Sequence, residues 1–120
     1  MEYIRNIAQL IIALGILNVW LLRFNKATVY RGGGAKNMKQ EFATYGLPVW
    51  FMWFVGGLKV LLALSLLVSF WRPELMRPAA IGMAILMLGA VGMHIKIGDA
   101  FKKTTPALSV LILALLMAFI

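Results

Sequence analysis

The chain has 120 residues, of which 62% are hydrophobic, and it carries a formal net charge of +8 and no cysteine. A small soluble domain cannot bury so much apolar surface, so this composition predicts an integral membrane protein with a single domain over residues 1–120. Without cysteine, the chain itself cannot perform dithiol exchange, thiolate catalysis or cysteine-based metal binding. Its basic residues lie between the apolar runs, which indicates contact with lipid headgroups and no nucleic-acid binding.

Four apolar stretches predict transmembrane helices at about 3–23, 47–70, 77–97 and 105–120. The second would be about 36 Å long as a helix, which exceeds the ~30 Å hydrocarbon core of a bilayer. Thr105 before Pro106 has the pattern of an N-cap followed by a proline at the first helical position. The first stretch lacks a small-x-small cleavage site, so we expect a helix there and no cleaved signal. The predicted fold is an all-α, four-transmembrane-helix bundle.

The connection between the first two spans predicts a short amphipathic interfacial helix at about 35–45. Its apolar residues recur at spacings of three and four: Ala35, Met38, Phe42 and Tyr45. The other faces carry Lys36, Asn37, Lys39, Gln40 and Glu41. This pattern is typical of a helix that lies in the membrane interface, and Gly46 is a natural stop for it. The preceding glycines 32–34 lack phosphate-loop spacing, so we interpret them as a hinge, with a backbone nest for an anion as the alternative.

The distribution of basic residues predicts the orientation. The first and third connections together hold Arg23, Lys26, Arg31, Lys36, Lys39, Lys96, Lys102 and Lys103. The opposite side holds Arg5, Arg72 and Arg77. This asymmetry predicts that the first and third connections face the cytoplasm of a bacterial inner membrane, with both termini outside. The candidates for interfacial or anion contacts are Arg23, Lys26, Arg31 and Lys36.

Lys59 lies near the middle of the second span, where a charge is costly and therefore indicates a partner, a wet pocket or a ligand. Its side chain points back toward the layer of Asn18, in the first span, and His94, in the third. We therefore predict an interior ligand-binding site of Lys59, Asn18 and His94, with Gly56 and Ala63 leaving space beside the lysine. The structural alternatives are a snorkelling or carbonyl-bonded lysine and a histidine that is merely hydrogen-bonded at the interface.

We expect the methionines and the aromatic residues near the span ends to serve packing and membrane anchoring. The spans contain no second histidine and no acidic residue, so we expect no metal site and no catalytic residue, and we interpret the eight methionines as packing residues. Five aromatic residues near the span ends are expected to be interfacial anchors: Trp20, Tyr45, Trp50, Trp53 and Trp71.

Several segments together resemble the DoxX-like family of small four-helix membrane proteins over essentially the whole chain. They are Asn18-Val-Trp-Leu-Leu-Arg-Phe-Asn-Lys, Tyr30-Arg-Gly-Gly-Gly-Ala, Glu41-Phe-Ala-Thr-Tyr-Gly-Leu-Pro, Gly57-Leu-Lys-Val, Pro78-Ala-Ala and His94-Ile-Lys-Ile-Gly-Asp. The resemblance implies a four-helix bundle. It also implies mixed roles, as a subunit of quinone-linked membrane oxidoreductases or, in distant relatives, as a chaperone of receptor assembly. It carries over no catalytic residue.

Three functions remain open. The first is a non-catalytic accessory subunit of a membrane redox system that binds a quinone-like or lipid-like ligand. The second is an assembly factor or chaperone that holds other membrane proteins, or copies of itself, through small-residue faces. The third is a small transporter or channel, although no span contains the carboxylate that cation exporters need.

Overall fold

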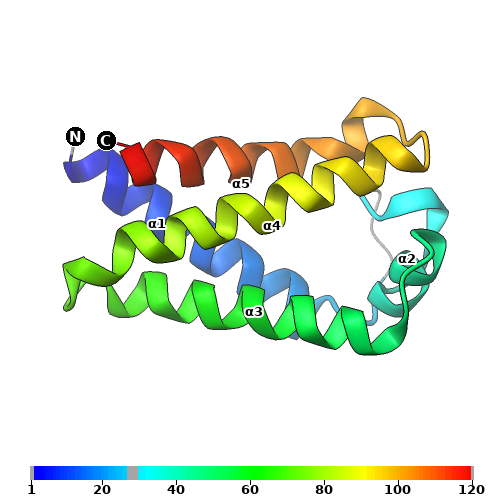
Figure 1. Ribbon diagram of the computed structural model, residues 1–120, viewed down its shortest axis with the longest axis horizontal. Helices are drawn as coiled ribbons and strands as arrows, with labels where there is room; N and C mark the ends of the chain where they lie inside the picture. The colour runs from blue at the N-terminus through cyan, green and yellow to red at the C-terminus, as the bar shows by residue number, and fades with distance from the viewer. Residues whose placement is uncertain (1, 27–29, 120) are drawn as a thin grey trace.

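The computed structural model describes residues 2–26 and 30–119 and contains four long helices in that part of the chain (Figure 1). The first, α1 (Glu2–Leu17), continues into a π-helical turn, η1 (Asn18–Leu22). The others are α3 (Val49–Val68), α4 (Met76–Lys96) and α5 (Phe101–Phe119). A short 3-10 turn, η3 (Pro73–Leu75), joins α3 to α4.

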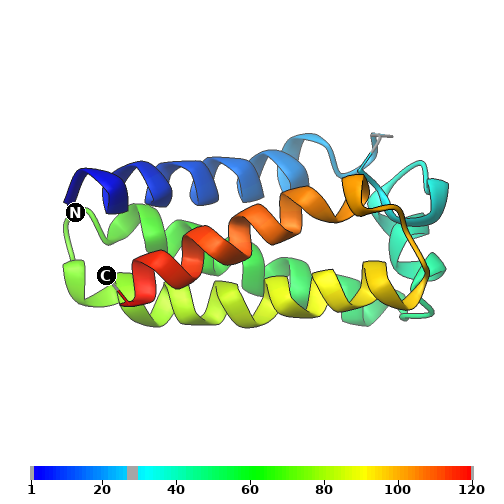
Figure 2. The same cartoon turned by 90° about the horizontal axis from the view of Figure 1, so that it is seen from above.

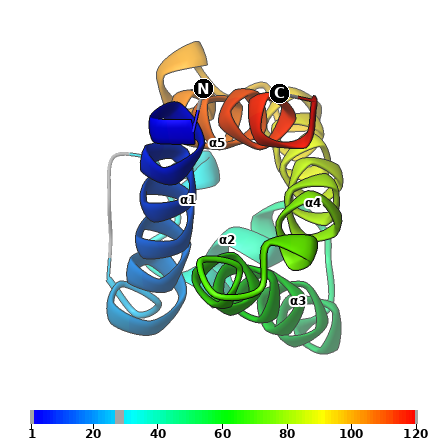
Figure 3. The ribbon, with the colours of Figure 1, turned by 90° about the vertical axis from the view of Figure 1, so that its left-hand side faces the viewer.

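The four long helices form an up-and-down bundle with both termini at one end (Figure 1). Viewed from that end, they form a ring in which α1 packs on α3 and α5, and α4 packs on α3 and α5 (Figure 3). The first and third connections lie together at the opposite end, in both side views (Figure 1 and Figure 2). The predicted grouping of these two connections on one side is therefore confirmed, and which side is cytoplasmic stays a prediction.

All four long helices have the length and hydropathy to cross a membrane, at Tyr3–Leu22, Val49–Val68, Pro73–Lys96 and Phe101–Phe119. With 20 residues, α3 is about 30 Å long, close to the thickness of the hydrocarbon core. The predicted all-α fold with four membrane-spanning helices is confirmed.

The interior of the bundle is built mainly from alanine and methionine side chains. The fully buried positions include Ala13, Ala63, Ala80, Ala114, Met52, Met83 and Met117. Small residues let the helix backbones approach, and the flexible methionines fill the gaps between them. The outward faces are also apolar, with Leu14, Leu61, Ile85 and Ile112 among the exposed residues. A bundle that is apolar on both sides fits a lipid environment.

The first connection contains a 3-10 turn, η2 (Gly32–Gly34), and a short helix, α2 (Met38–Thr44). Asn37 caps α2 by accepting a hydrogen bond from the Gln40 N–H, and Gly46 ends it with a φ of 80°. The helix is thus shorter than the predicted 35–45, and its position in the membrane interface stays a prediction. Met38 and Phe42 pack into the bundle core.

The last span begins earlier than its sequence pattern predicted. Helix α5 starts at Phe101, and Pro106 lies inside it. A proline there cannot donate to the carbonyl oxygen of Lys102, but the hydroxyl of Thr105 donates to that oxygen at 2.7 Å. Thr105 therefore satisfies the backbone inside the helix, and its predicted role as N-cap is wrong.

Two of the five predicted aromatic anchors are buried. Trp20 is 7% exposed and Tyr45 is 6% exposed, because both rings pack against the bundle. The other three, Trp50, Trp53 and Trp71, are exposed at the helix ends as an anchoring role requires. Hydropathy alone locates an aromatic residue along the span but does not say which way its ring points.

Candidate functional site

Lys59 is buried on the inner face of α3, with 9% of its surface exposed. Its ammonium nitrogen lies 5.6 Å from the centre of the Trp20 ring, which is a cation–π contact. No residue in the described part of the chain gives this nitrogen a hydrogen-bond acceptor. Among the described residues, every fully buried side-chain nitrogen or oxygen has a hydrogen-bond partner. The ammonium nitrogen of Lys59 has none, so it keeps some accessible surface. Lys59 thus offers unused N–H donors within the bundle.

The Trp20 ring reaches Lys59 because α3 leaves space for it at Gly56. Trp20 lies in η1, and a π-helical turn of this kind often accompanies a functional site. On α3, Gly56 is one turn before Lys59, and any Cβ added there would overlap the indole ring. Phe24 and Phe42 complete the surroundings, each with its ring centre 6.0 Å from that of Trp20. The predicted space beside the lysine is thus present, but Trp20 fills part of it.

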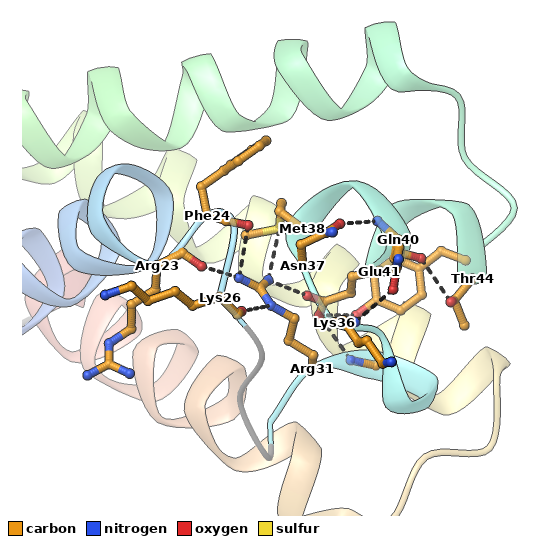
Figure 4. A network of polar contacts seen from close by, with 12 residues as sticks. Arg23, Phe24, Lys26, Arg31, Lys36, Asn37, Met38, Gln40, Glu41 and Thr44 are labelled. Carbon is orange, nitrogen blue, oxygen red and sulfur yellow. Dashed lines mark hydrogen bonds and ion pairs between the residues drawn. The ribbon is translucent and has the colours of Figure 1, made fainter.

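A second group of polar residues lies at the end of the bundle and is centred on Arg31 (Figure 4). Arg31 is 4% exposed and forms an ion pair with Glu41 at 3.0 Å. Its guanidinium also donates to the carbonyl oxygens of Lys26 at 2.7 Å, Phe24 at 3.3 Å and Arg23. Arg31 therefore ties the end of the first span to α2.

Glu41 connects this ion pair to the third connection. Besides Arg31, its carboxylate accepts hydrogen bonds from the Gly32 N–H at 3.2 Å and from the Tyr45 hydroxyl at 2.8 Å. The Tyr45 hydroxyl lies 3.4 Å from Nε2 of His94, whose Nδ1 contacts Asp99 at 2.7 Å. We call the set Arg31, Glu41, Tyr45, His94 and Asp99 the polar clasp. It joins the first connection to the end of α4 and the residues that follow.

Asp99 links the polar clasp to the glycine turn η2. Its carboxylate accepts a hydrogen bond from the Gly33 N–H at 3.0 Å, and Gly33 has a φ of 61°, which favours glycine. The N–H groups of Gly32 and Gly33 therefore both bind carboxylates of the chain itself. The alternative interpretation of this turn was a backbone nest whose N–H groups bind an anion. In the structure, the carboxylates of Glu41 and Asp99 accept hydrogen bonds from these N–H groups.

Burial and charge decide the protonation of two members of the clasp. Burial raises the pKa of the Tyr45 phenol above its usual range, and the neighbouring Glu41 carboxylate raises that pKa further. Burial also raises the pKa of Asp99, but the hydrogen bonds from Gly33 and His94 outweigh it, so that this pKa is lowered. At neutral pH Tyr45 is therefore a neutral donor and Asp99 an anionic acceptor.

Among the described residues, no hydrogen bond joins the three residues of the predicted interior site, whose role as a ligand site stays a prediction. His94 lies in the polar clasp and Lys59 lies against Trp20, while Asn18 is half-buried at the start of η1. Within residues 2–26 and 30–119, no hydrogen bond joins Lys59 to either of the other two. Of the candidates for anion contacts, Arg23, Lys26 and Lys36 are exposed, whereas the guanidinium of Arg31 is taken up by the clasp.

Sequence reasoning missed Glu41, Tyr45 and Asp99 as parts of one network. Glu41 was assigned to the polar side of the 35–45 helix, yet it is buried, because position 41 is three residues from Met38 and shares its face. That three-residue spacing was the one sequence signal that could have indicated the burial of Glu41. At the other end of the bundle, the buried Gln9 donates to Ser69 and to the Leu66 carbonyl, which sequence reasoning also missed.

The fold and these polar groups define a multi-pass membrane protein with four spanning helices and a polar network at one end. The sequence model of the DoxX-like family matches residues 16–119. This match covers most of the chain, so the protein belongs to the DoxX-like family. No curated protein and no solved structure matches the chain at a significant level.

Proposed function

We propose that the protein is a non-catalytic subunit of a membrane redox system, and that Lys59 binds the carbonyl or anionic head of a quinone-like or lipid-like molecule. One observation carries the proposal: the ammonium nitrogen of Lys59 lies over the Trp20 ring, 5.6 Å from its centre, and has no hydrogen-bond acceptor among the described residues. A cation–π contact stabilises the charge by about 0.5–2 kcal/mol and leaves its N–H groups free. A carbonyl oxygen of a ligand would satisfy one of them.

The test compares Lys59→Met with Lys102→Met, an exposed lysine outside the polar clasp. The full-length proteins are purified in mild detergent, and their bound small molecules are extracted and identified by mass spectrometry. We expect the Lys59 variant to lose a carbonyl-bearing or anionic molecule that the parent and the Lys102 variant retain. Thermal unfolding should show that Lys59→Met is at least as stable as the parent, because a buried ammonium that lacks a hydrogen-bond acceptor is removed from the bundle. A Lys59 variant that keeps the same bound molecules and full activity of its complex would contradict the proposal.

A second candidate, an assembly factor, is supported by open small residues on the outside of α4. Gly89 and Gly92 are exposed at a spacing of three, and a Cβ at either position would meet nothing within 4 Å. Such positions let a partner helix approach closely. Replacing both by leucine should prevent co-purification of a membrane-protein partner while leaving the molecules bound near Lys59 unchanged. If a partner is retained by this variant, the assembly role is contradicted.

A further inference from the structure

A groove of about 840 Å³ lies at the end of the bundle that carries the termini, away from the polar clasp. Arg5 of α1 and Arg77 of α4 line it together with apolar residues of α4, chiefly Pro78, Ile81 and Ile85. Two basic residues distant in sequence are thus brought to one concave surface. The sequence places both arginines on one side of the membrane but does not predict that they share a groove, and the proposed function does not involve them.

In the part of the chain that the structure describes, no carboxylate neutralises the two arginines of the groove. Glu74 also lines it, but its carboxylate forms an ion pair with Arg72 at 2.7 Å. Neither Arg5 nor Arg77 forms an ion pair in the part of the chain that the structure describes. Helix α4 also begins here, at Met76, and its first turn adds a partial positive charge. The groove therefore attracts an anion.

The apolar wall of the groove determines what kind of anion fits. Ile81 is 40% exposed and Ile85 is 65% exposed, on a helix that has the length and hydropathy to cross a membrane. From Arg77 to Ile85 the helix rises about 12 Å, which takes the wall from the headgroup level well into the hydrocarbon. Water does not fill an apolar surface at that depth, whereas an acyl chain does. The ligand must thus combine a negative head with a hydrocarbon tail.

We propose that this groove is a binding site for a phospholipid with an anionic headgroup. The guanidinium groups of Arg5 and Arg77 bind the phosphate, since arginine is suited to bidentate contacts with phosphate oxygens. One acyl chain lies along Pro78, Ile81 and Ile85. A second copy of this protein fits the groove less well, because a symmetric contact would bring the same arginines together.

The test measures lipid selectivity with spin-labelled lipids in bilayers that contain the full-length protein. Electron paramagnetic resonance gives the association of labelled phosphatidylglycerol relative to labelled phosphatidylcholine. We expect the Arg5→Gln/Arg77→Gln variant to lose selectivity for phosphatidylglycerol by about fivefold for each arginine removed. The matched control, Lys39→Gln/Lys102→Gln, removes the same charge at the opposite end and should keep the parent selectivity. Arg77 is exposed, so Arg77→Gln alone gives a variant whose folding is not at risk.

Several outcomes would overturn the proposal. An equal loss of selectivity in the control would show that net charge alone attracts the lipid. Full suppression of the selectivity by inorganic phosphate would assign the site to a free anion. Cross-linking of two copies of the Ile85→Cys variant in bilayers would show that a protein helix occupies the groove. Unchanged selectivity in the arginine variants would exclude the site altogether.

Discussion

Replacing Arg31 by methionine should destabilise the protein more than the loss of any exposed basic residue. The side chains of Arg31 and Glu41 are 4% and 12% exposed, so the variant leaves a carboxylate where water hardly reaches. Removing one partner of a buried ion pair costs about 3–5 kcal/mol. The Gly32 N–H and the Tyr45 hydroxyl still donate to Glu41, so we expect the lower part of that range, about 3 kcal/mol.

A double-mutant cycle separates the ion pair from the rest of the clasp. Glu41→Gln keeps an oxygen that can accept from Gly32 and Tyr45 but removes the charge that Arg31 compensates. The double variant Arg31→Met/Glu41→Gln should therefore be more stable than Arg31→Met alone. We expect a coupling energy of about 1–3 kcal/mol between the two positions, because they are in direct contact.

Stability is measured on the full-length protein in micelles by titration with sodium dodecyl sulfate, followed by tryptophan fluorescence. Hydrogen exchange of residues 30–45 shows whether the clasp opens locally. Arg72→Met is the matched control, because its ion pair with Glu74 is exposed and should contribute little. The reasoning is refuted if Arg31→Met costs no more than Arg72→Met, or if the two substitutions in the clasp are strictly additive.

Three further predictions concern other parts of the molecule. The pKa of Asp99 is lowered in the folded protein, so its carboxylate contributes to the free energy of unfolding above its ordinary pKa of 3.8, and this contribution is lost as the pH falls below that value. The free energies of unfolding at pH 6 and pH 3 should therefore differ less in Asp99→Asn than in the parent. Gly56→Ala should cost about 1–3 kcal/mol and shift tryptophan emission, because the added Cβ overlaps an indole ring, whereas Gly57→Ala, with nothing within 4 Å, should be neutral. The Lys36→Cys variant should resist a membrane-impermeant thiol reagent added to intact cells, and the Glu74→Cys variant should react; the reverse labelling would invert the predicted orientation.

The sequence by itself determined the features that depend on local composition. Runs of apolar residues predicted four spans, the lysine within the second span predicted a buried charge, and Gly46 predicted the end of the short helix. Each of these follows from hydropathy or backbone preference read along one segment. Burial of Lys59 and the φ of Gly46 confirm the last two.

Only the tertiary structure decided which side chains meet. Trp20 was expected at the headgroups but lies against Lys59, and the ring nitrogens of His94, a candidate partner of that lysine, contact Tyr45 and Asp99. The physical reason is that hydropathy measures the depth of a residue in the membrane, whereas a contact also requires the rotation of two helices about their axes. In this chain that rotation depends on the π-helical turn and on small residues such as Gly56, whose effect appears only when the helices are packed together.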